Sequence, residues 1–323
     1  MPRATDESSQ NPRGAPGASA SGAPDVDLAL EAIDTAARVA ESGEWTPPPV
    51  AAPTDFRALE VGRVRSGLER ILLGRDPESG LDALLVSGFL PALLPEINSM
   101  VGFGDGEFLH KDVWKHTKQV VRQSVPRIEV RWAALLHDIG KIKTRKISPD
   151  GEVHFIGHAE VGASMFDRMQ RRLPLFRGDD KLADSIRFLI LHHLRASGYD
   201  RDWTDSAVRR FAREMGPCLG DLFDLSRADI TTKSAERRRR GLESISELSA
   251  RVRALAELDA KVPPLPKGLG TAITARFGIE PSPVLGELMK TLRAAAENGE
   301  IEAQQDYEYY LDHLVRAGLV PKP

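Results

Sequence analysis

The sequence predicts an all-α fold that carries one small β-hairpin. Apolar residues recur at helical spacing along most of the 323-residue chain, which is 41% hydrophobic but only 6% aromatic. Ala, Leu, Arg and Glu, which are strong helix formers, are more prominent than the β-branched residues that sheets prefer. The chain shows no alternation of strand and helix patterns. Its length allows a large buried core, which we expect packed helices to form.

The first 54 residues are expected to form a disordered tail with one marginal helix. Residues 1–24 are mostly Ser, Gly, Ala and Pro, and they contain too little apolar surface to become ordered by burial. Residues 25–41 show helical spacing of apolar side chains, but prolines at 47–49 and 53 separate them from the rest of the chain. This tail could serve as a contact for a partner chain.

Residues 55–100 are expected to form a helical segment that resembles a neck. Thr54 or Asp55 can cap its first helix, and Gly74 ends that helix. Pro77 starts a second helix, which ends at Gly88. A short apolar stretch, 90–97, then leads into the glycine-rich residues 102–106.

Residues 101–235 are expected to form a central helical domain. The spacing of apolar residues predicts helices near 113–121, 128–139, 159–172, 179–194, 205–214 and 219–233. The run 146–155, with Pro149, Asp150 and Gly151 at its centre, predicts the β-hairpin. The remaining residues, 236–323, are expected to form a helical tail with helices near 236–260, 282–298 and 304–317.

Charge and cysteine content narrow the classes of function. A formal net charge of −3 provides no overall attraction to nucleic acid or anionic lipid. Cys218 is the single cysteine, so an internal disulfide cannot form, and a reducing compartment is expected. The sequence shows neither a signal-peptide pattern nor an apolar run long enough to span a bilayer. We therefore expect a cytoplasmic protein with no membrane partner.

Histidine and aspartate side chains in apolar helical settings predict a metal site. Its expected ligands are His116, His137, Asp138, His158, His192, His193 and Asp229. Separate helices of a bundle can direct such side chains to one point. Imidazole and carboxylate together suit Mn, Fe, Co, Ni or Zn better than calcium. We expect one or two divalent ions, drawn from these metals or Mg.

Asp138 and Lys141 are the expected catalytic residues. A carboxylate can bridge two metal ions, and a two-metal site can hold the attacking and the leaving oxygens of a phosphoester. Lys141 lies three residues after Asp138, which would place both side chains on one face if the helix continues. Its ammonium group could then stabilise charge that develops on a phosphate oxygen.

Some of the histidines have simpler interpretations. A histidine on an apolar face is often only a hydrogen-bonded core residue, and His154 and His313 are assigned to that class. One member of the His192–His193 pair could contact a metal ligand rather than the metal itself. The role of His110 stays open; if this residue lies near the site, we expect it at the mouth.

The acids also have alternatives. Asp229 could pair with Lys233 one turn later on the same helix. Asp112 is expected to cap the helix of His116 rather than bind metal. A buried Asp138 without a cation would be costly, which favours the ligand interpretation there.

These residues resemble a known family. His116, then His137-Asp138, then Asp229 resembles the H…HD…D signature of the HD-domain superfamily of metal-dependent phosphohydrolases. The run from His137 to Lys141, with the later histidines, is also similar to the two-metal variant of HD-GYP phosphodiesterases. Four motifs resemble the HD region of bacterial CCA-adding tRNA nucleotidyltransferases and poly(A) polymerases: DVWKHT at 112–117, RWAALLHDIGK at 131–141, GEVHFIGH at 151–158 and LHHLR at 191–195. The likeness extends, more loosely, from residue 57 to the C-terminus.

The resemblance implies a metal-dependent phosphohydrolase that acts on a phosphoester of a nucleotide or an RNA end. It makes 2′,3′-cyclic phosphates and 2′-phosphates the first substrates to test. Members of that family also carry a nucleotidyltransferase head with an Asp-x-Asp motif before this region. Here only Asp25-Val26-Asp27 imitates that motif, without the strands that would hold it, so nucleotide addition by this chain alone is not expected. A head could instead be supplied by another chain.

Arg237, Arg238, Arg239 and Arg240 form a basic run that could bind RNA. A charge run is commonly a solvated helix face, and Glu236 and Glu243 partly neutralise this one. The resemblance adds tRNA as a candidate partner. No cluster of base-stacking aromatic residues accompanies the run, so it offers no sequence-specific readout. The rival to an enzyme is therefore a helical RNA-binding or partner-binding module without catalysis.

Overall fold

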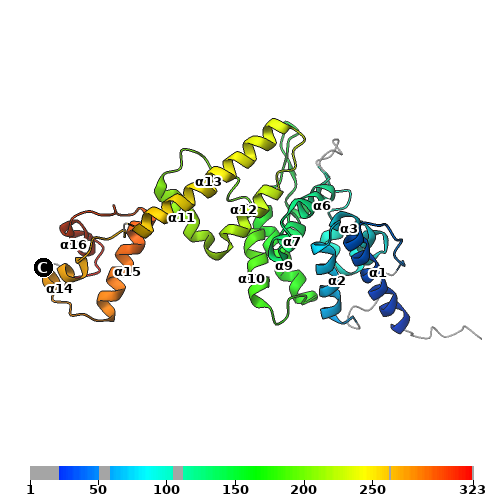
Figure 1. Ribbon diagram of the computed structural model, residues 1–323, viewed down its shortest axis with the longest axis horizontal. Helices are drawn as coiled ribbons and strands as arrows, with labels where there is room; N and C mark the ends of the chain where they lie inside the picture. Colours follow the sequence, from blue (N-terminus) through cyan, green and yellow to red (C-terminus); the bar gives the residue numbers. More distant parts are fainter. Residues whose placement is uncertain (1–21, 51–58, 105–111, 262, 322–323) are drawn as a thin grey trace, which may run out of the picture.

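The computed structural model describes residues 22–50, 59–104, 112–261 and 263–321, and it confirms an all-α fold with one small hairpin (Figure 1). The helices are α1 (Gly22–Ser42), α2 (Val61–Leu73), α3 (Pro77–Val86), α4 (Phe89–Leu93), α5 (Pro95–Asn98), α6 (Val113–Gln123), α7 (Ile128–Leu136), α8 (Lys141–Thr144), α9 (His158–Arg172), α10 (Asp180–His192), α11 (Asp205–Met215), α12 (Leu219–Ala228), α13 (Ala235–Lys261), α14 (Leu269–Phe277), α15 (Pro283–Asn298) and α16 (Tyr307–Arg316). The hairpin strands, β1 (Lys146–Ile147) and β2 (Val153–His154), pair antiparallel. Among the described residues, no helix combines the length and apolarity that a bilayer span requires.

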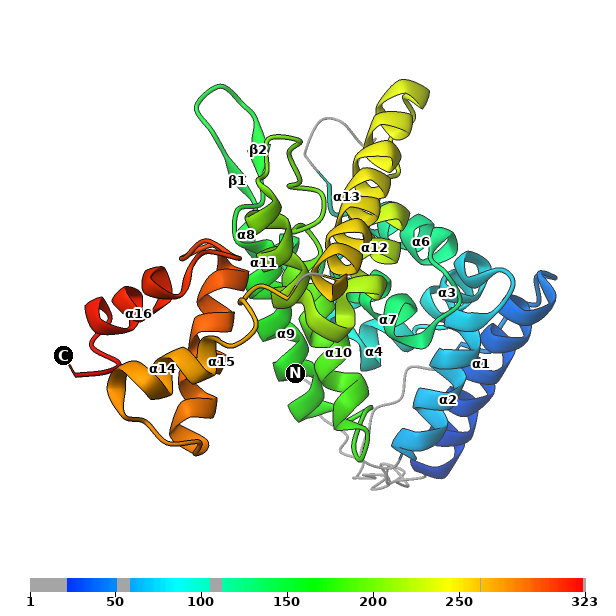
Figure 2. The ribbon, with the colours of Figure 1, turned by 60° about the vertical axis from the view of Figure 1, so that its left-hand side comes forward.

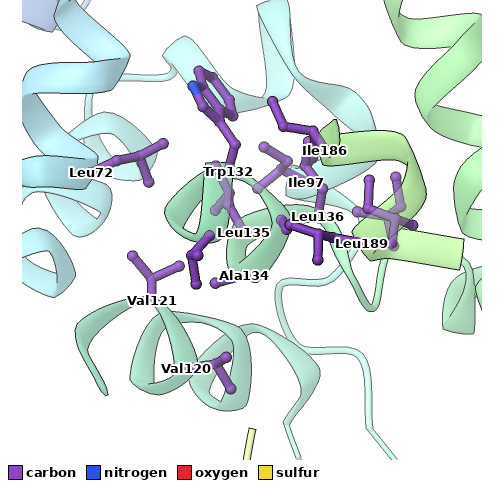
Figure 3. Packing of buried hydrophobic residues seen from close by; sticks show 14 of the residues in the cluster. Leu72, Ile97, Val120, Val121, Trp132, Ala134, Leu135, Leu136, Ile186 and Leu189 are labelled. Carbon is purple, nitrogen blue, oxygen red and sulfur yellow. The ribbon is translucent and has the colours of Figure 1, made fainter. Parts of the chain in front are cut away.

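Helix α7 is the centre of the main core. Every residue from Val130 to Leu136 is buried, and the helix packs against α2, α6, α10 and α12. A helix that is apolar on all sides is stable only when other helices surround it. Figure 3 shows Trp132 and Leu136 of this helix among buried side chains from neighbouring helices. Because α7 ends at Leu136, His137 and Asp138 follow directly at the end of the most buried helix.

The structure differs from the expected N-terminal tail. Helix α1 packs against α2 and α3, and its buried face consists largely of alanines: Ala29, Ala32, Ala36, Ala37 and Ala40. At the crossing with α2, a Cβ added to Gly67 would lie 2.0 Å from Ile33 Cγ2, so only glycine permits this approach. Small residues on both helices therefore allow α1 to pack closely and to become part of the main core. Residues 1–21 lie outside the described residues, and a partner contact there stays a proposal.

The C-terminal helices have a second, separate core. Leu269, Ile273, Leu292, Tyr310 and Leu314 are buried between α14, α15 and α16. Sequence patterning predicted α15 and α16 but not α14.

The C-terminal unit contacts the rest of the molecule through α15 and α11, where Ser206 Oγ donates to Asn298 O over 3.1 Å. Helix α13, by contrast, buries Ile245 and Leu248 in the main core. The division into tail, neck, central domain and C-terminal part stays a proposal. The two cores favour a boundary near residue 262 rather than 235.

Candidate metal centre

Six ligand-type side chains converge where five helices meet. His116 comes from α6, His137 and Asp138 follow α7, His158 starts α9, His193 follows α10, and Asp229 follows α12. The turn after Asp138 can lie against the start of α9 because residue 140 is glycine. A Cβ added to Gly140 would lie 2.0 Å from the main-chain oxygen of His158. This close approach brings Asp138 and His158 together.

The side chains form two groups that share Asp138. One group contains His116, His137 and Asp138, and the other contains Asp138, His158 and His193; in each, the ligand atoms lie within 4.8 Å of one another. Asp138 Oδ2 faces the first group, 3.4 Å from His116 Nε2 and 3.3 Å from His137 Nε2. Its Oδ1 faces the second, 3.6 Å from His158 Nε2. The two oxygens of one carboxylate are therefore directed at different groups.

Asp229 joins the first group. Its Oδ1 lies 3.0 Å from His116 Nε2 and 3.5 Å from His137 Nε2. Helix α12 ends at Ala228, not near 233 as predicted, so Asp229 and Lys233 do not share a helix. Asp229 therefore faces the histidines rather than Lys233.

Hydrogen bonds fix the orientation of three histidine rings. Each directs Nδ1 to the main-chain oxygen three residues earlier: His137 to Ala134 (2.8 Å), His158 to Phe155 (2.7 Å) and His193 to Ile190 (2.7 Å). A carbonyl oxygen only accepts, so Nδ1 carries the proton and, in the neutral ring, Nε2 presents a lone pair to the cluster. His116 Nδ1 instead lies 2.9 Å from the hydroxyl of Thr231, a residue that sequence patterning missed.

This arrangement of lone pairs fits a divalent metal. His158 Nε2 and His193 Nε2 are 3.1 Å apart, and His116 Nε2 and His137 Nε2 are 3.3 Å apart. Neutral rings held this way repel one another unless a proton or a metal cation lies between them. Two nitrogens that bind one tetrahedral metal ion at about 2.0–2.1 Å lie about 3.3 Å from each other, which is close to the separations seen here. The donor set of imidazole nitrogens and carboxylate oxygens suits transition metals.

Comparison with known proteins identifies the part of the chain that holds this cluster. Residues 110–259 match the family model of the HD domain. This stretch is therefore similar to the HD domain. The match includes all six clustered side chains.

Curated relatives are similar over a longer stretch. The chain is 32% identical over 255 residues to the A-adding tRNA nucleotidyltransferase of Deinococcus radiodurans, which is 76% of this chain and 56% of the relative. It is 30% identical over 258 residues to the CC-adding tRNA nucleotidyltransferase of Thermus thermophilus, again 56% of the relative. A Multifunctional CCA protein of Mannheimia succiniciproducens is 30% identical over 161 residues, 47% of this chain and 35% of the relative. The chain thus spans about half the length of the first two of these relatives.

The two groups of the HD domain hold protons differently. Burial opposes the charged form of His137, but the carboxylates of Asp138 and Asp229 outweigh it and raise its pKa to about 10. In the second group, burial and the nearby His137 lower the pKa of His193 to about 4. Burial also disfavours the ionised acids, yet the facing histidines hold the pKa values of Asp138 and Asp229 well below their usual range. A bound cation would take the place of the protons in the first group.

The cluster opens to solvent on one side. The side chains of His116, Asp229 and Lys141 are each 22% exposed, whereas those of His137 and Asp138 are 1% exposed. Lys141 Nζ lies 2.6 Å from Asp138 Oδ2, which agrees with the predicted pairing of these residues. The first group and Lys141 therefore line the open side of the cluster.

The structure does not bring His192 into the cluster. Its ring centre lies 4.3 Å from that of Phe188, and the charges around it are Arg195, Glu214 and Glu160. The two histidines follow each other in sequence at the end of α10, so their side chains point in different directions. His193 alone reaches the other ligands, and the expectation of His192 as a metal ligand is not supported by its position.

The other candidates lie outside the cluster or outside the described residues. Asp112 caps α6, since its carboxylate accepts a hydrogen bond from the main-chain N–H of Lys115 over 2.9 Å. His154, in β2, is exposed rather than a core residue, and His313, in α16, is half-buried; both lie outside the cluster. His110 falls outside the described residues.

The basic run lies on the first turns of α13 and is exposed. Arg239 pairs with Glu236 (3.1 Å) and Glu243 (2.8 Å), and Arg240 pairs with Glu236 (3.0 Å). Within the described part of the chain, Arg237 and Arg238 have no such acidic partner. Figure 2 shows the start of α13 and the hairpin projecting from the same side of the helical bundle.

Proposed function

We propose that the HD domain hydrolyses a phosphoester of a nucleotide or an RNA end with the help of divalent metal. The main support is Asp138, whose two oxygens face two separate histidine pairs. His116, His137, Asp138 and Asp229 would hold one ion, and Asp138, His158 and His193 the other. Mn, Fe, Co, Ni, Zn or Mg, when bound, would polarise a phosphoryl oxygen and lower the pKa of water.

The protein's own side chains supply orientation and charge. Asp138 holds the two groups at a fixed separation because it is buried and its backbone lies against α9 through Gly140. Lys141, on the open side, can move its ammonium group from Asp138 to a phosphate oxygen that gains negative charge. Thr231 keeps Nε2 of His116 directed at the cluster.

The relatives support the class of substrate. Their names describe proteins that add nucleotides to tRNA, so a tRNA end is the first macromolecular substrate to consider. The exposed Arg237 and Arg238 provide cations that could contact its phosphates. We propose 2′,3′-cyclic phosphates and 2′-phosphates as the reacting groups, and a cytoplasmic location.

The test is a hydrolysis assay with metal-loaded protein on 2′,3′-cyclic AMP, 2′-AMP and bis(p-nitrophenyl) phosphate. We expect activity in the wild type, loss of at least about 100-fold in His193→Ala and Asp138→Ala, and a smaller loss in Lys141→Gln. His192→Ala is the matched control, because it removes the adjacent histidine and should keep activity. Equal activities in the His192 and His193 variants would contradict the assignment.

A second candidate is an RNA-binding module without catalysis, which the exposed arginines on α13 favour. It predicts no hydrolysis of any substrate and equal tRNA affinity in the wild type and in folded Asp138→Ala. The tRNA affinity of both proteins, measured beside hydrolysis, separates the two functions.

A further inference from the structure

Two phenylalanine rings and two cations lie beside the open side of the metal centre. Phe155 follows β2, Phe103 follows the α5 region, and their ring centres are 6.4 Å apart at an angle of 54°. Lys141 Nζ lies 5.6 Å from the centre of the Phe155 ring. The guanidinium carbon of Arg145 lies 5.9 Å from the centre of the Phe103 ring. The two rings therefore lie next to each other, and each has a cation beside it.

Phe155 is connected to the metal centre in two ways. Its main-chain oxygen accepts the Nδ1–H of His158 over 2.7 Å, so its backbone sets the orientation of a candidate ligand. Its ring faces Lys141, whose Nζ lies 2.6 Å from Asp138 Oδ2. The ring is thus next to the position where a phosphate would contact Lys141.

This edge remains accessible and apolar. Neither phenylalanine is fully buried, and Ile156, the residue after Phe155, is 82% exposed. Contiguous exposed apolar side chains with polar groups at their rim mark binding surfaces. Phe and the planar guanidinium of Arg are the side chains on which nucleobases stack.

We propose that Phe155, Phe103 and Arg145 form a subsite for the nucleobase that adjoins the reacting phosphate. The position of that phosphate rests on the proposed function. In a nucleotide, one sugar separates the base from the phosphate, which matches a phosphate on Lys141 and a base on the neighbouring rings. Every base has an aromatic face, so the subsite accepts any base and favours nucleotides over sugar phosphates.

The test compares two probes that the protein cannot hydrolyse, the methylene phosphonate analogues of AMP and of ribose 5-phosphate. Titration calorimetry with Mn-loaded wild type should show the AMP analogue binding roughly 5- to 150-fold more tightly, the range expected for base stacking. Phe155→Leu should lose most of this preference while keeping its affinity for the ribose analogue, and Phe155→Tyr should retain the preference. Phe188→Leu, the same change beside His192, is the control.

Equal affinity of the wild type for both probes overturns the subsite, as does an equal loss for both probes in Phe155→Leu. The latter result would mean that the Phe155 ring supports the site as a whole and does not bind the base. Hydrolysis of bis(p-nitrophenyl) phosphate by the same samples keeps the two proposals separate. Hydrolysis without base preference refutes only the subsite, and base preference without hydrolysis of any tested phosphoester refutes only the proposed function.

Discussion

Thr231 provides a sharp test of how the metal ligands are oriented. His137, His158 and His193 are oriented by main-chain oxygens, which a substitution cannot remove. His116 depends on the hydroxyl of Thr231, 2.9 Å from its Nδ1. Thr231→Val keeps the shape of the side chain but removes the hydroxyl that pairs with Nδ1, so the ring of His116 loses its fixed orientation.

The expected result is selective weakening of the first metal group. Loss of a partner that orients a ligand typically costs about 10- to 100-fold in metal affinity, or about 1.4–2.7 kcal/mol. Affinity at the group of His158 and His193 should not change, because Thr231 does not contact it. Competition with a chromogenic zinc chelator measures both affinities, and Thr231→Ser should restore the wild-type value. Unchanged affinity in Thr231→Val, or a serine variant as weak as the valine variant, would refute the reasoning.

Three further predictions concern stability and RNA. In metal-free protein, the raised pKa of His137 (about 10) stabilises the fold below pH 6.5, and this contribution is lost as the pH rises toward 10. The lowered pKa of His193 (about 4) has the opposite effect, because stability is lost as the pH falls from 6.5 to 4. Urea unfolding should therefore show a maximum near pH 6.5, and no change between pH 6.5 and 9 would contradict it. Arg131→Met should lower the free energy of unfolding by about 1–3 kcal/mol, because buried Arg131 donates to the oxygens of Leu72 (2.8 Å) and Val125 (3.2 Å). An unchanged urea midpoint would argue against that role. Replacing Arg237 and Arg238 by serine should weaken tRNA binding and lower the slope of log affinity against log salt concentration by about 2. The same change at the glutamate-paired Arg239 and Arg240 should have a smaller effect. Equal effects of the two pairs would count against phosphate contacts.

Much of the metal centre could be predicted from the sequence. His137 and Asp138 follow a helix that is buried from Val130 to Leu136, a setting in which polar side chains need a partner. The sequence could not separate His193 from His192, because the direction of a side chain at the end of a helix depends on how the last turn closes. It also could not reveal Thr231, which lies outside the regular helices and acts only through His116.

Two of the elements that sequence patterning misjudged, α1 and α14, have small or sparse apolar faces. The buried face of α1 is mainly alanine, and its packing depends on Gly67 of another helix, which no local pattern records. Helix α14 buries only Leu269 and Ile273, too few for a helical period beside a proline-rich link. Both helices are stabilised mainly by packing against other helices, which the local composition does not reveal.

The metal content of purified, reconstituted protein tests the central claim most directly. If Asp138 joins two metal groups, elemental analysis should find two equivalents in the wild type and in His192→Ala. His193→Ala should keep one equivalent, and Asp138→Ala should lose both. A wild type that binds no metal after reconstitution, or a His193 variant that still holds two equivalents, would contradict the account.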